Sequence, residues 1–352
     1  MSGVKRVSIK DIARLANVSH PTVSRALHHS GLVNPETAER IRRIAVESGY
    51  RPSAVARSLV TSKTHTVGVV VTSIADPFVA GVVAGIEDEA NAHEYSVFLA
   101  NSNADPAREI KVVRSFEERR VDGIIVTASR VGALYADVLS QVRIPVVLLN
   151  NEHPSEFVHS VRIADYEAGR QAARHLRDLG HRRIAYIGDR YGRSSDTERF
   201  SGYRATLDEA DIPFQPDLVV HGDGLPEGGA LAMERLLQLP DLPSAVFCFN
   251  DMTAIGALKA ARMHGLEVPR DISIIGFDDL FFAQYTEPPL TTIRQPEHEM
   301  GRLAMETLLK LLGGNEAEQS IKVPGELIVR QSTARYEVPA AGLLAVASVA
   351  EG

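Results

Sequence analysis

Three stretches near the start of the chain carry apolar residues at helical spacing. The first covers positions 9–16, the second follows Ser19, and the third lies between Asn34 and Gly49. Ser19 and Asn34 are residue types that cap helix starts, and a glycine commonly ends a helix. The pattern therefore predicts three short helices joined by tight turns.

From Thr66 onwards, short apolar runs alternate with amphipathic stretches. Continuous apolar strands that alternate with helices indicate parallel sheets covered on both faces. The strands are expected at 66–72, 95–101, 123–128, 145–150, 183–188, 244–249 and 272–277, and the helices at 79–92, 106–119, 166–179, 199–210, 226–238, 252–264 and 296–312.

Seven such strands exceed one ordinary sheet, so the α/β core is expected to contain two doubly wound parallel-sheet subdomains. The small apolar residues at the end of the chain predict a disordered tail. The expected boundaries are a three-helix head at 7–52, a hinge at 53–65, a core at 66–335 and a tail at 336–352, with one subdomain at 66–162 and 292–323 and the other at 163–291 and 324–335.

The composition of the chain indicates its class of protein and its cellular compartment. Hydrophobic residues make up 44% and charged residues 24% of the 352 positions, a profile typical of globular proteins. The single cysteine, Cys248, rules out a disulfide framework, and the charged N-terminus lacks a secretory pattern. No apolar run is long enough to span a membrane, so the sequence predicts a cytoplasmic protein.

The net charge of −7 hides a strong asymmetry between the two ends of the chain. Residues 1–65 hold 11 Lys and Arg against four Asp and Glu, a charge of +7, and the remaining 287 residues carry −14. Lys and Arg displace the counterions of a nucleic-acid backbone. A basic head on an acidic body thus favours DNA binding, although a solvated basic surface would show the same charges.

Several motifs, in a fixed order, resemble the lactose-repressor (LacI) family. The head and hinge read SIKDIARLANVSHPTVSRAL, NPETAERIRRIAVESGYRP and AVARSL, and the core reads VDGIIV, LGHRRIAYIG, FNDMTAIGALKAA, VPRDISIIGFDD and PPLTTIRQP. The resemblance runs over about residues 7–335. It implies a helix-turn-helix head, a core like that of periplasmic sugar-binding proteins, and a homodimer that binds a palindromic operator in double-stranded DNA.

In a helix-turn-helix, the second helix enters the major groove and its first residues reach the base edges. By resemblance, His20, Pro21 and Arg25 read bases, and Arg25 can donate two hydrogen bonds to guanine. For Ser19, the alternative is that it caps the helix and makes no contact with DNA. The short hydroxyl side chains are otherwise suited to phosphate oxygens, at Ser19, Thr22 and Ser24.

The hinge motif AVARSL places Leu59 in a basic, polar segment, where an exposed leucine is unusual. The family explains such a leucine as a wedge between base pairs of the minor groove. Arg57, in the same motif, is expected to contact DNA. The alternative is that Leu59 packs against the core.

Polar residues follow several of the predicted strands, and ligands of α/β proteins bind at the carboxyl ends of strands. Asn250 and Asp278 could instead be simple helix caps. Phe78 could stack on a ring, and the other side chains can exchange hydrogen bonds with hydroxyl groups. The expected effector-binding residues are Thr72, Phe78, Thr127, Asn150, Arg199, Asn250, Asp278 and Gln295.

The sequence therefore predicts a transcriptional repressor whose operator affinity is set by a small effector, a sugar or sugar derivative. A repressor that depends on a purine-type corepressor is the main alternative, and a sugar-binding protein without a DNA function is a second. No catalytic or metal-binding motif occurs, so no enzymatic activity, cofactor or metal is expected.

Overall fold

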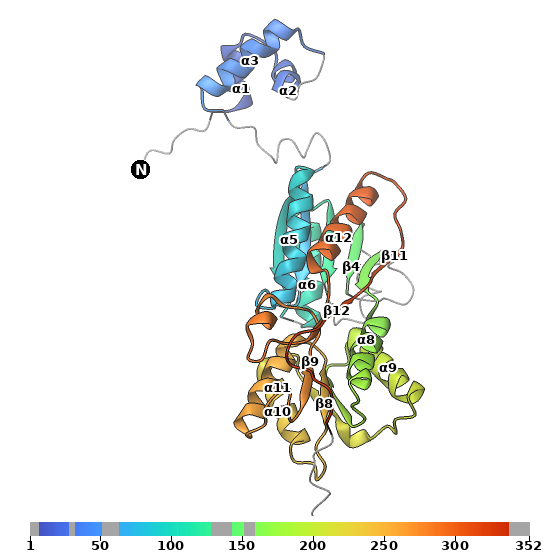
Figure 1. Ribbon diagram of the computed structural model, residues 1–352. Helices are drawn as coiled ribbons and strands as arrows, with labels where there is room; N and C mark the ends of the chain where they lie inside the picture. Colours follow the sequence, from blue (N-terminus) through green and yellow to red (C-terminus); the bar gives the residue numbers. More distant parts are fainter. Residues whose placement is uncertain are drawn as a thin grey trace, which may run out of the picture. The chain divides into compact units, whose positions relative to one another are not determined.

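The computed structural model describes residues 7–27, 32–50, 63–103, 105–127, 143–150 and 159–337 (Figure 1). The chain divides into two compact units, Met1–His65 and Thr66–Gly352, and each is described by itself. The expected hinge helix with Arg57 and Leu59, and the tail after residue 337, lie outside the described residues.

The head consists of three helices, as the sequence predicts. Ser8 accepts a hydrogen bond from the Asp11 backbone and Asn34 accepts one from the Glu36 backbone, so both side chains cap a helix start. The apolar stripes of all three helices meet in one small core that includes Ile12, Val23 and Ile41. The helices are α1 (Ile9–Leu15), α2 (His20–Leu27) and α3 (Pro35–Glu47).

Two arginines of α3 form hydrogen bonds to the other two helices. Arg40 donates to the carbonyl of Ala16 at 3.2 Å, and Arg42 donates to that of Ala26 at 3.3 Å. Each carbonyl lies at the C-terminal end of a helix, where positive charge is favoured. The exposed surface of α2 is therefore held in a fixed position on the head.

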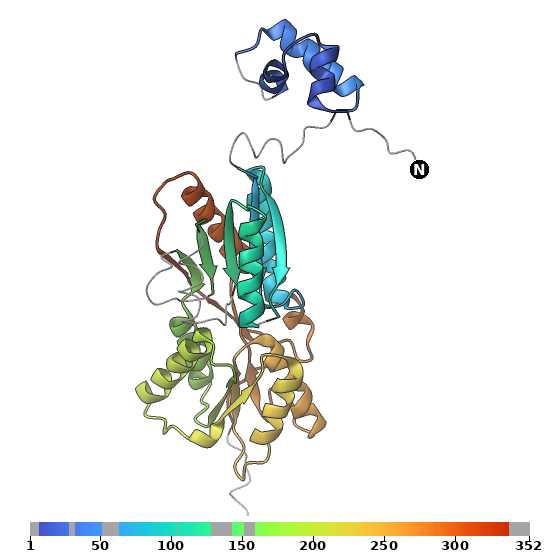
Figure 2. The same ribbon diagram turned by 180° about the vertical axis from the view of Figure 1, so that it is seen from behind.

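The first sheet of the core has six parallel strands in the order β11-β5-β4-β3-β1-β2. Alternate residues of its central strands face different helices: Ile125 packs with α5 and α12, whereas Ile124 packs with α6. Accordingly, α5 and α12 lie toward the viewer in Figure 1, and α6 does so in Figure 2. The elements are β1 (Thr66–Val71), α5 (Pro77–Ala92), β2 (Ser96–Asn101), α6 (Pro106–Glu118), β3 (Gly123–Thr127), β4 (Val146–Leu149), β5 (Ser160–Ile163), α12 (Glu297–Leu312) and β11 (Ser320–Val323).

The second sheet has four parallel strands in the order β7-β6-β8-β9. Helices α8 and α9 cover one face, where Tyr186 and Phe247 pack, and α10 and α11 cover the other. The elements are α8 (Asp165–Asp178), β6 (Ile184–Asp189), α9 (Ser194–Glu209), β7 (Val219–Gly222), α10 (Pro226–Leu236), β8 (Ala245–Cys248), α11 (Asp251–Met263) and β9 (Ser273–Ile275), with short 3-10 helices at Pro216–Leu218 and Phe281–Tyr285.

The main chain passes between the two sheets three times. The first passage is at Ala164, between β5 and α8. The second and third run through an antiparallel pair, β10 (Thr292–Arg294) and β12 (Glu326–Ile328). The two subdomains of the core are therefore joined by three adjacent connections.

The two doubly wound sheets agree with the predicted fold class, but the sequence-based assignment missed five strands. These strands, β5, β7, β10, β11 and β12, have only three or four residues each, too few for a clear apolar run. The predicted helix at 199–210 was also wrong at its start, since α9 begins at Ser194. The exact subdomain boundaries stay predictions.

None of the helices within the described ranges is both long enough and apolar enough to span a bilayer.

We predict that Gly85→Ala destabilises the core by about 1–3 kcal/mol, because α5 and α12 cross with almost no space between them. A Cβ atom at Gly85 would lie 1.9 Å from the His298 carbonyl oxygen, so one of the two helices would have to move. Urea denaturation measures the loss. The control, Ala107→Leu, changes an exposed position of α6 and should stay within about 0.5 kcal/mol of the parent. Equal stability of both variants would contradict this packing.

Candidate functional site

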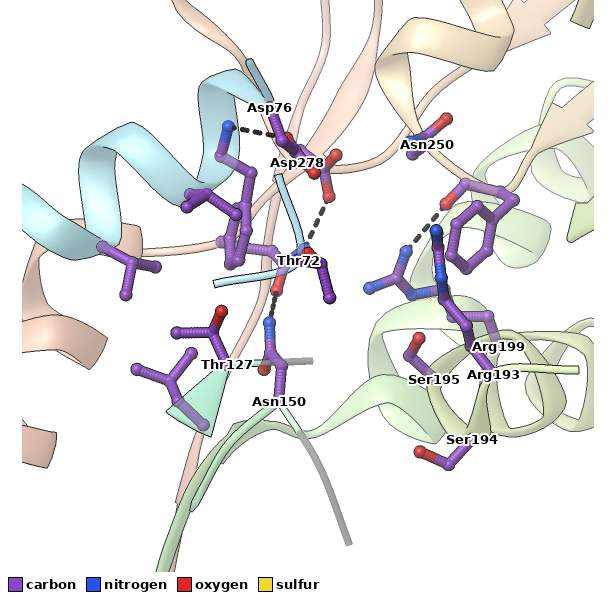
Figure 3. A pocket seen from close by; sticks show the side chains of 16 residues that line it. Thr72, Asp76, Thr127, Asn150, Arg193, Ser194, Ser195, Arg199, Asn250 and Asp278 are labelled. Atoms are coloured by element: carbon purple, nitrogen blue, oxygen red, sulfur yellow. Dashed lines mark hydrogen bonds between the residues drawn. The ribbon is translucent and has the colours of Figure 1, made fainter. Parts of the chain in front are cut away.

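A cavity of about 90 Å³ lies between the two subdomains, at the carboxyl ends of strands from both sheets. Thr127 ends β3, and Thr72 and Asn150 directly follow β1 and β4. A second cavity of about 320 Å³ shares Asp76 and Arg193 with the first and continues the cleft. The first cavity is lined by Thr72, Asp76, Phe78, Val79, Val82, Thr127, Leu149, Asn150, Arg193, Ser194, Ser195, Arg199, Phe249, Asn250, Asp278 and Gln295 (Figure 3).

All eight residues expected at the effector site are among those that line this cavity. They come from positions as distant in sequence as Thr72 and Gln295. Their role in binding stays a prediction, but their assembly in one place is a feature of the fold.

Arg199 is the most firmly held of these residues. Its Nε donates to Asp165 at 2.7 Å, and its Nη1 donates to the Phe249 carbonyl at 2.8 Å. The guanidinium also lies 3.6 Å from the ring centroid of Phe277. The sequence had suggested that Arg199 is the first residue of its helix. This was wrong, because Arg199 lies in the second turn of α9.

Asp165, the partner of Arg199, is nearly as buried as the arginine itself. Burial raises the pKa of Asp165, and the charge of Arg199 opposes that rise. A buried charge pair of this kind is costly to separate, because either partner alone would be an uncompensated charge. The pair therefore fixes the direction in which Arg199 meets the cavity.

A chain of hydrogen bonds crosses the cleft through Gln295. Its Nε2 donates to Asp278 at 2.6 Å, and its Oε1 accepts from Asn150 at 3.4 Å (Figure 3). Asp278 follows the second sheet and Asn150 the first, so side chains of both subdomains meet on a residue of the second passage.

Asp278 is not a helix cap, because no helix starts beside it; its backbone has a φ of 121°. Burial raises the pKa of Asp278 well above its usual value, and Arg199 opposes the rise. A ligand hydroxyl that donates to this carboxylate would favour its charged form.

Asn250 is a helix cap, one of the two roles that the sequence left open. Its Oδ1 accepts from the Thr253 backbone at 2.9 Å, which caps α11, and its Nδ2 donates to the Gly224 carbonyl at 3.1 Å. An amide has a second hydrogen and a second lone pair. Asn250 can therefore cap its helix and still contact a ligand.

Two polar atoms in the wall of the cavity have no hydrogen-bond partner within the described residues: Thr127 Oγ1 and Asn150 Oδ1. Both are buried, and unpaired buried polar atoms are uncommon and destabilising. A bound polar ligand would satisfy them. Both atoms belong to the subdomain opposite Arg199, so the cavity offers polar groups from both of its walls.

Several lining residues were not anticipated from the sequence. Asp76 caps α5 by accepting from the Phe78 backbone at 3.1 Å; burial raises the pKa of Asp76, and the charge of Arg193 opposes the rise. The Asp-Pro-Phe sequence after a strand carried the signal for this cap. The other polar ones, Arg193, Ser194 and Ser195, depend on the true start of α9, and the remaining ones are Val79, Val82, Leu149 and Phe249.

In the head, the residues expected to read bases lie on the surface of α2. His20, Pro21 and Arg25 are exposed, whereas Val23 on the same helix is buried. Ser19 accepts from the Thr22 backbone at 3.4 Å and bonds to the Thr22 hydroxyl at 2.8 Å. Ser19 is thus a cap, and its exposed position still allows a phosphate contact.

The fold and these two sites define a class of protein: a regulator with a helix-turn-helix head and a ligand-binding core of two subdomains. Residues 8–53 match the model for bacterial regulatory proteins of the lacI family, and residues 173–333 match that for periplasmic binding protein-like domains. The chain belongs to the lacI family.

Similar proteins cover nearly the whole chain. The ribose operon repressor of Haemophilus influenzae is 36% identical, over 92% of this chain and 98% of its own length. The transcriptional repressor PurR of Aliivibrio salmonicida is 34% identical, over 92% and 98%. The crystal structure of the lac repressor dimer bound to operator and the anti-inducer ONPF has a TM-score of 0.86 at 27% identity, covering 94% of this chain and all of that one.

We predict that the stability of the core falls as pH rises from about 4 to about 7, through Asp251. Burial raises the pKa of Asp251 to about 7. The hydrogen bonds that Asp251 accepts from Thr292 and from the Leu280 backbone act in the opposite direction and lower the pKa. The folded state thus keeps a proton that the unfolded state loses in this window, and each step upward in pH favours unfolding.

Asp251→Asn mimics the protonated carboxyl group, so this variant should lose less stability than the parent between about pH 5 and about pH 8. Denaturant unfolding at both pH values gives the comparison. Asp208→Asn, at an exposed carboxylate, is the control and should follow the parent. Parallel pH profiles for Asp251→Asn and the parent would show that Asp251 is ionised throughout.

Proposed function

We propose that the chain is a homodimeric repressor whose affinity for a palindromic operator is controlled by a sugar bound in the cleft. The observation that carries the proposal is the cavity itself: polar side chains from both subdomains converge there, and two of their buried atoms have no partner in the described protein. Because its target is chromosomal DNA, the proposed place of action is the cytoplasm, and no enzymatic step is part of the proposal.

The head provides the DNA contacts. We assign base reading to His20, Pro21 and Arg25, and phosphate contacts to Ser19, Thr22 and Ser24. The charge of +7 on residues 1–65 supports this assignment. For Arg57 and Leu59 of the hinge, the proposed contact is the minor groove.

The chemistry of the cleft favours a sugar. Carboxylate, amide and guanidinium groups can pair with neighbouring hydroxyls, and Phe78 offers an apolar surface to a ring. The similarity to a ribose operon repressor points the same way. The alternative effector is a purine corepressor. A thermal-shift screen of sugars, sugar phosphates and purines would distinguish the two classes.

A ligand that touches both walls of the cleft favours one arrangement of the subdomains. A segment as short as the hinge motif is not expected to form a stable helix alone, so we propose that any helix there depends on DNA and on the state of the core. By linkage, the ligand changes operator affinity only through its different affinities for the two states, and we expect a coupling of about 1–3 kcal/mol. We propose that ligand binding weakens DNA binding.

The proposal is tested first by a gel-shift experiment with palindromic duplexes recovered by selection from random DNA. A repressor retards such DNA, whereas a sugar-binding protein or an enzyme without a DNA function does not. Recovery of no palindromic sequence would refute the DNA-binding part of the proposal.

We predict that Arg25→Ala weakens binding to the selected operator by about 1–3 kcal/mol and relaxes the preference at one base position of each half-site. The loss of a bidentate contact to a base removes sequence information as well as charge. Arg14→Ala, which removes an exposed arginine of α1, is the control and should weaken binding to all sequences equally. A repeated selection with Arg25→Ala that returned the parent motif would contradict base reading by Arg25.

We predict that Asp278→Ala abolishes the response to the effector and leaves the operator affinity of the free protein close to that of the parent. Asp278 lies in the core cavity, so its loss removes a ligand contact and no DNA contact. Operator affinity is measured with and without the effector found in the screen. Asp217→Ala, at an exposed position of the same subdomain, should respond as the parent does. A full response by Asp278→Ala would refute the assignment of this site.

A further inference from the structure

Two consecutive aspartates after β9 bond to different partners. Asp278 lines the cavity and accepts from Gln295, whereas Asp279 is not among the residues that line it. Both have left-handed backbone conformations, with φ of 121° and 59°, which are unfavourable for residues other than glycine. The surrounding contacts must therefore hold this loop in place.

Asp279 binds two arginines, one on each of two passages between the subdomains. Arg294 belongs to β10 and donates from Nε to one carboxylate oxygen at 2.8 Å. Arg330 follows β12 and donates from Nη2 to the other oxygen at 2.5 Å. One carboxylate thus joins the second and the third passages to the loop that carries Asp278.

The carboxylate of Asp279 and its pair with Arg330 are largely shielded from water, whereas Arg294 is 46% exposed. The side chain of Asp279 is 7% exposed and that of Arg330 is 17% exposed. Arg330 is further fixed by a bond from Nη1 to the Leu290 carbonyl at 2.7 Å. Removal of one partner from a shielded pair leaves the other charge with less compensation, so breaking the pair is costly.

A second set of bonds supports the same loop from α11. Asp251, at the start of that helix, accepts from the Leu280 backbone at 2.9 Å and from the Thr292 hydroxyl at 2.6 Å. The backbone N–H of Asp279 is 3.4 Å from the same hydroxyl oxygen. The loop, β10 and α11 therefore form one connected unit.

We propose that Asp279 is the positioning residue that couples the effector cavity to the second and third passages between the subdomains. Asp278 and Gln295, which face the cavity, are the direct neighbours in sequence of Asp279 and Arg294. Asp278 and Gln295 are already bonded to each other, so a ligand that contacts either of them acts on the double ion pair, and through it on both passages. The inference rests on the proposed function, since it presumes that the cleft and the operator are linked.

The test measures hydrogen exchange of the full-length protein, free and bound to the selected operator duplex. Linkage is reciprocal, so operator binding must alter the cleft if ligand binding alters the head. In the parent, we expect operator binding to change exchange in the cleft segments 72–79 and 193–199. In Asp279→Asn, which keeps the size of the side chain and removes its charge, the operator should still bind and this change should be lost.

Glu326→Gln is the matched control, because it removes an exposed carboxylate 3.1 Å from the same Arg294 and leaves the pair with Asp279 intact. It should transmit the change as the parent does. If Asp279→Asn does not fold, Arg294→Gln replaces it, since Arg294 is 46% exposed and its loss is better tolerated.

Transmission in Asp279→Asn equal to that in the parent would overturn the role of Asp279, even if the variant melts at a lower temperature. Loss of transmission in Glu326→Gln as well would overturn it too, because the effect would not then be specific to Asp279. An unchanged cleft in the parent on operator binding would instead refute the linkage in the proposed function, and the inference with it.

Discussion

The three passages of the main chain between the two sheets are the constraint on which the rest of the core depends. Because of them, neither subdomain is one continuous piece of sequence: β5 and β11 belong to the same sheet although Ser160 and its partner Ser320 are 160 positions apart in the sequence. The subdomains cannot separate, and they can move relative to each other only by bending at the passages. The same three passages therefore shape the cleft between the subdomains and are the places where the core can bend.

Ion pairs made by buried carboxylates fix these segments in direction. The first passage leads into Asp165, which pairs with Arg199, and the other two end on the arginines that bind Asp279. Ion pairs of this kind add little to stability compared with apolar contacts, but they tolerate few alternative arrangements. The apolar cluster that runs through both subdomains supplies the packing, and the charge pairs select the orientation in which the polar residues of the cleft face one another.

The sequence predicts the parts of this protein that depend on local pattern. Buried strands such as β3 and β8 appear as continuous apolar runs, and the head helices carry caps and apolar stripes. The rule that ligands bind at the carboxyl ends of strands was sufficient to find most of the eight expected residues of the cavity, whereas Arg199 was expected at the start of a helix and Gln295 in the return crossover. It did not find Arg193, Ser194 and Ser195, because the first turn of α9 is polar and has no side-chain cap, nor the strands β10 and β12, which pair only after the chain has crossed between subdomains.

The discontinuity of the core also sets the order in which it can form during synthesis. The head has its own small core and is complete once residue 50 has left the ribosome. The six-stranded sheet, by contrast, must wait for α12, which covers one of its faces, and for its edge strand β11, both made among the last residues of the described chain. The growing chain thus holds an unfinished sheet with an unpaired edge while the whole second subdomain is being made, and this interval is the one in which its apolar surface is open to aggregation.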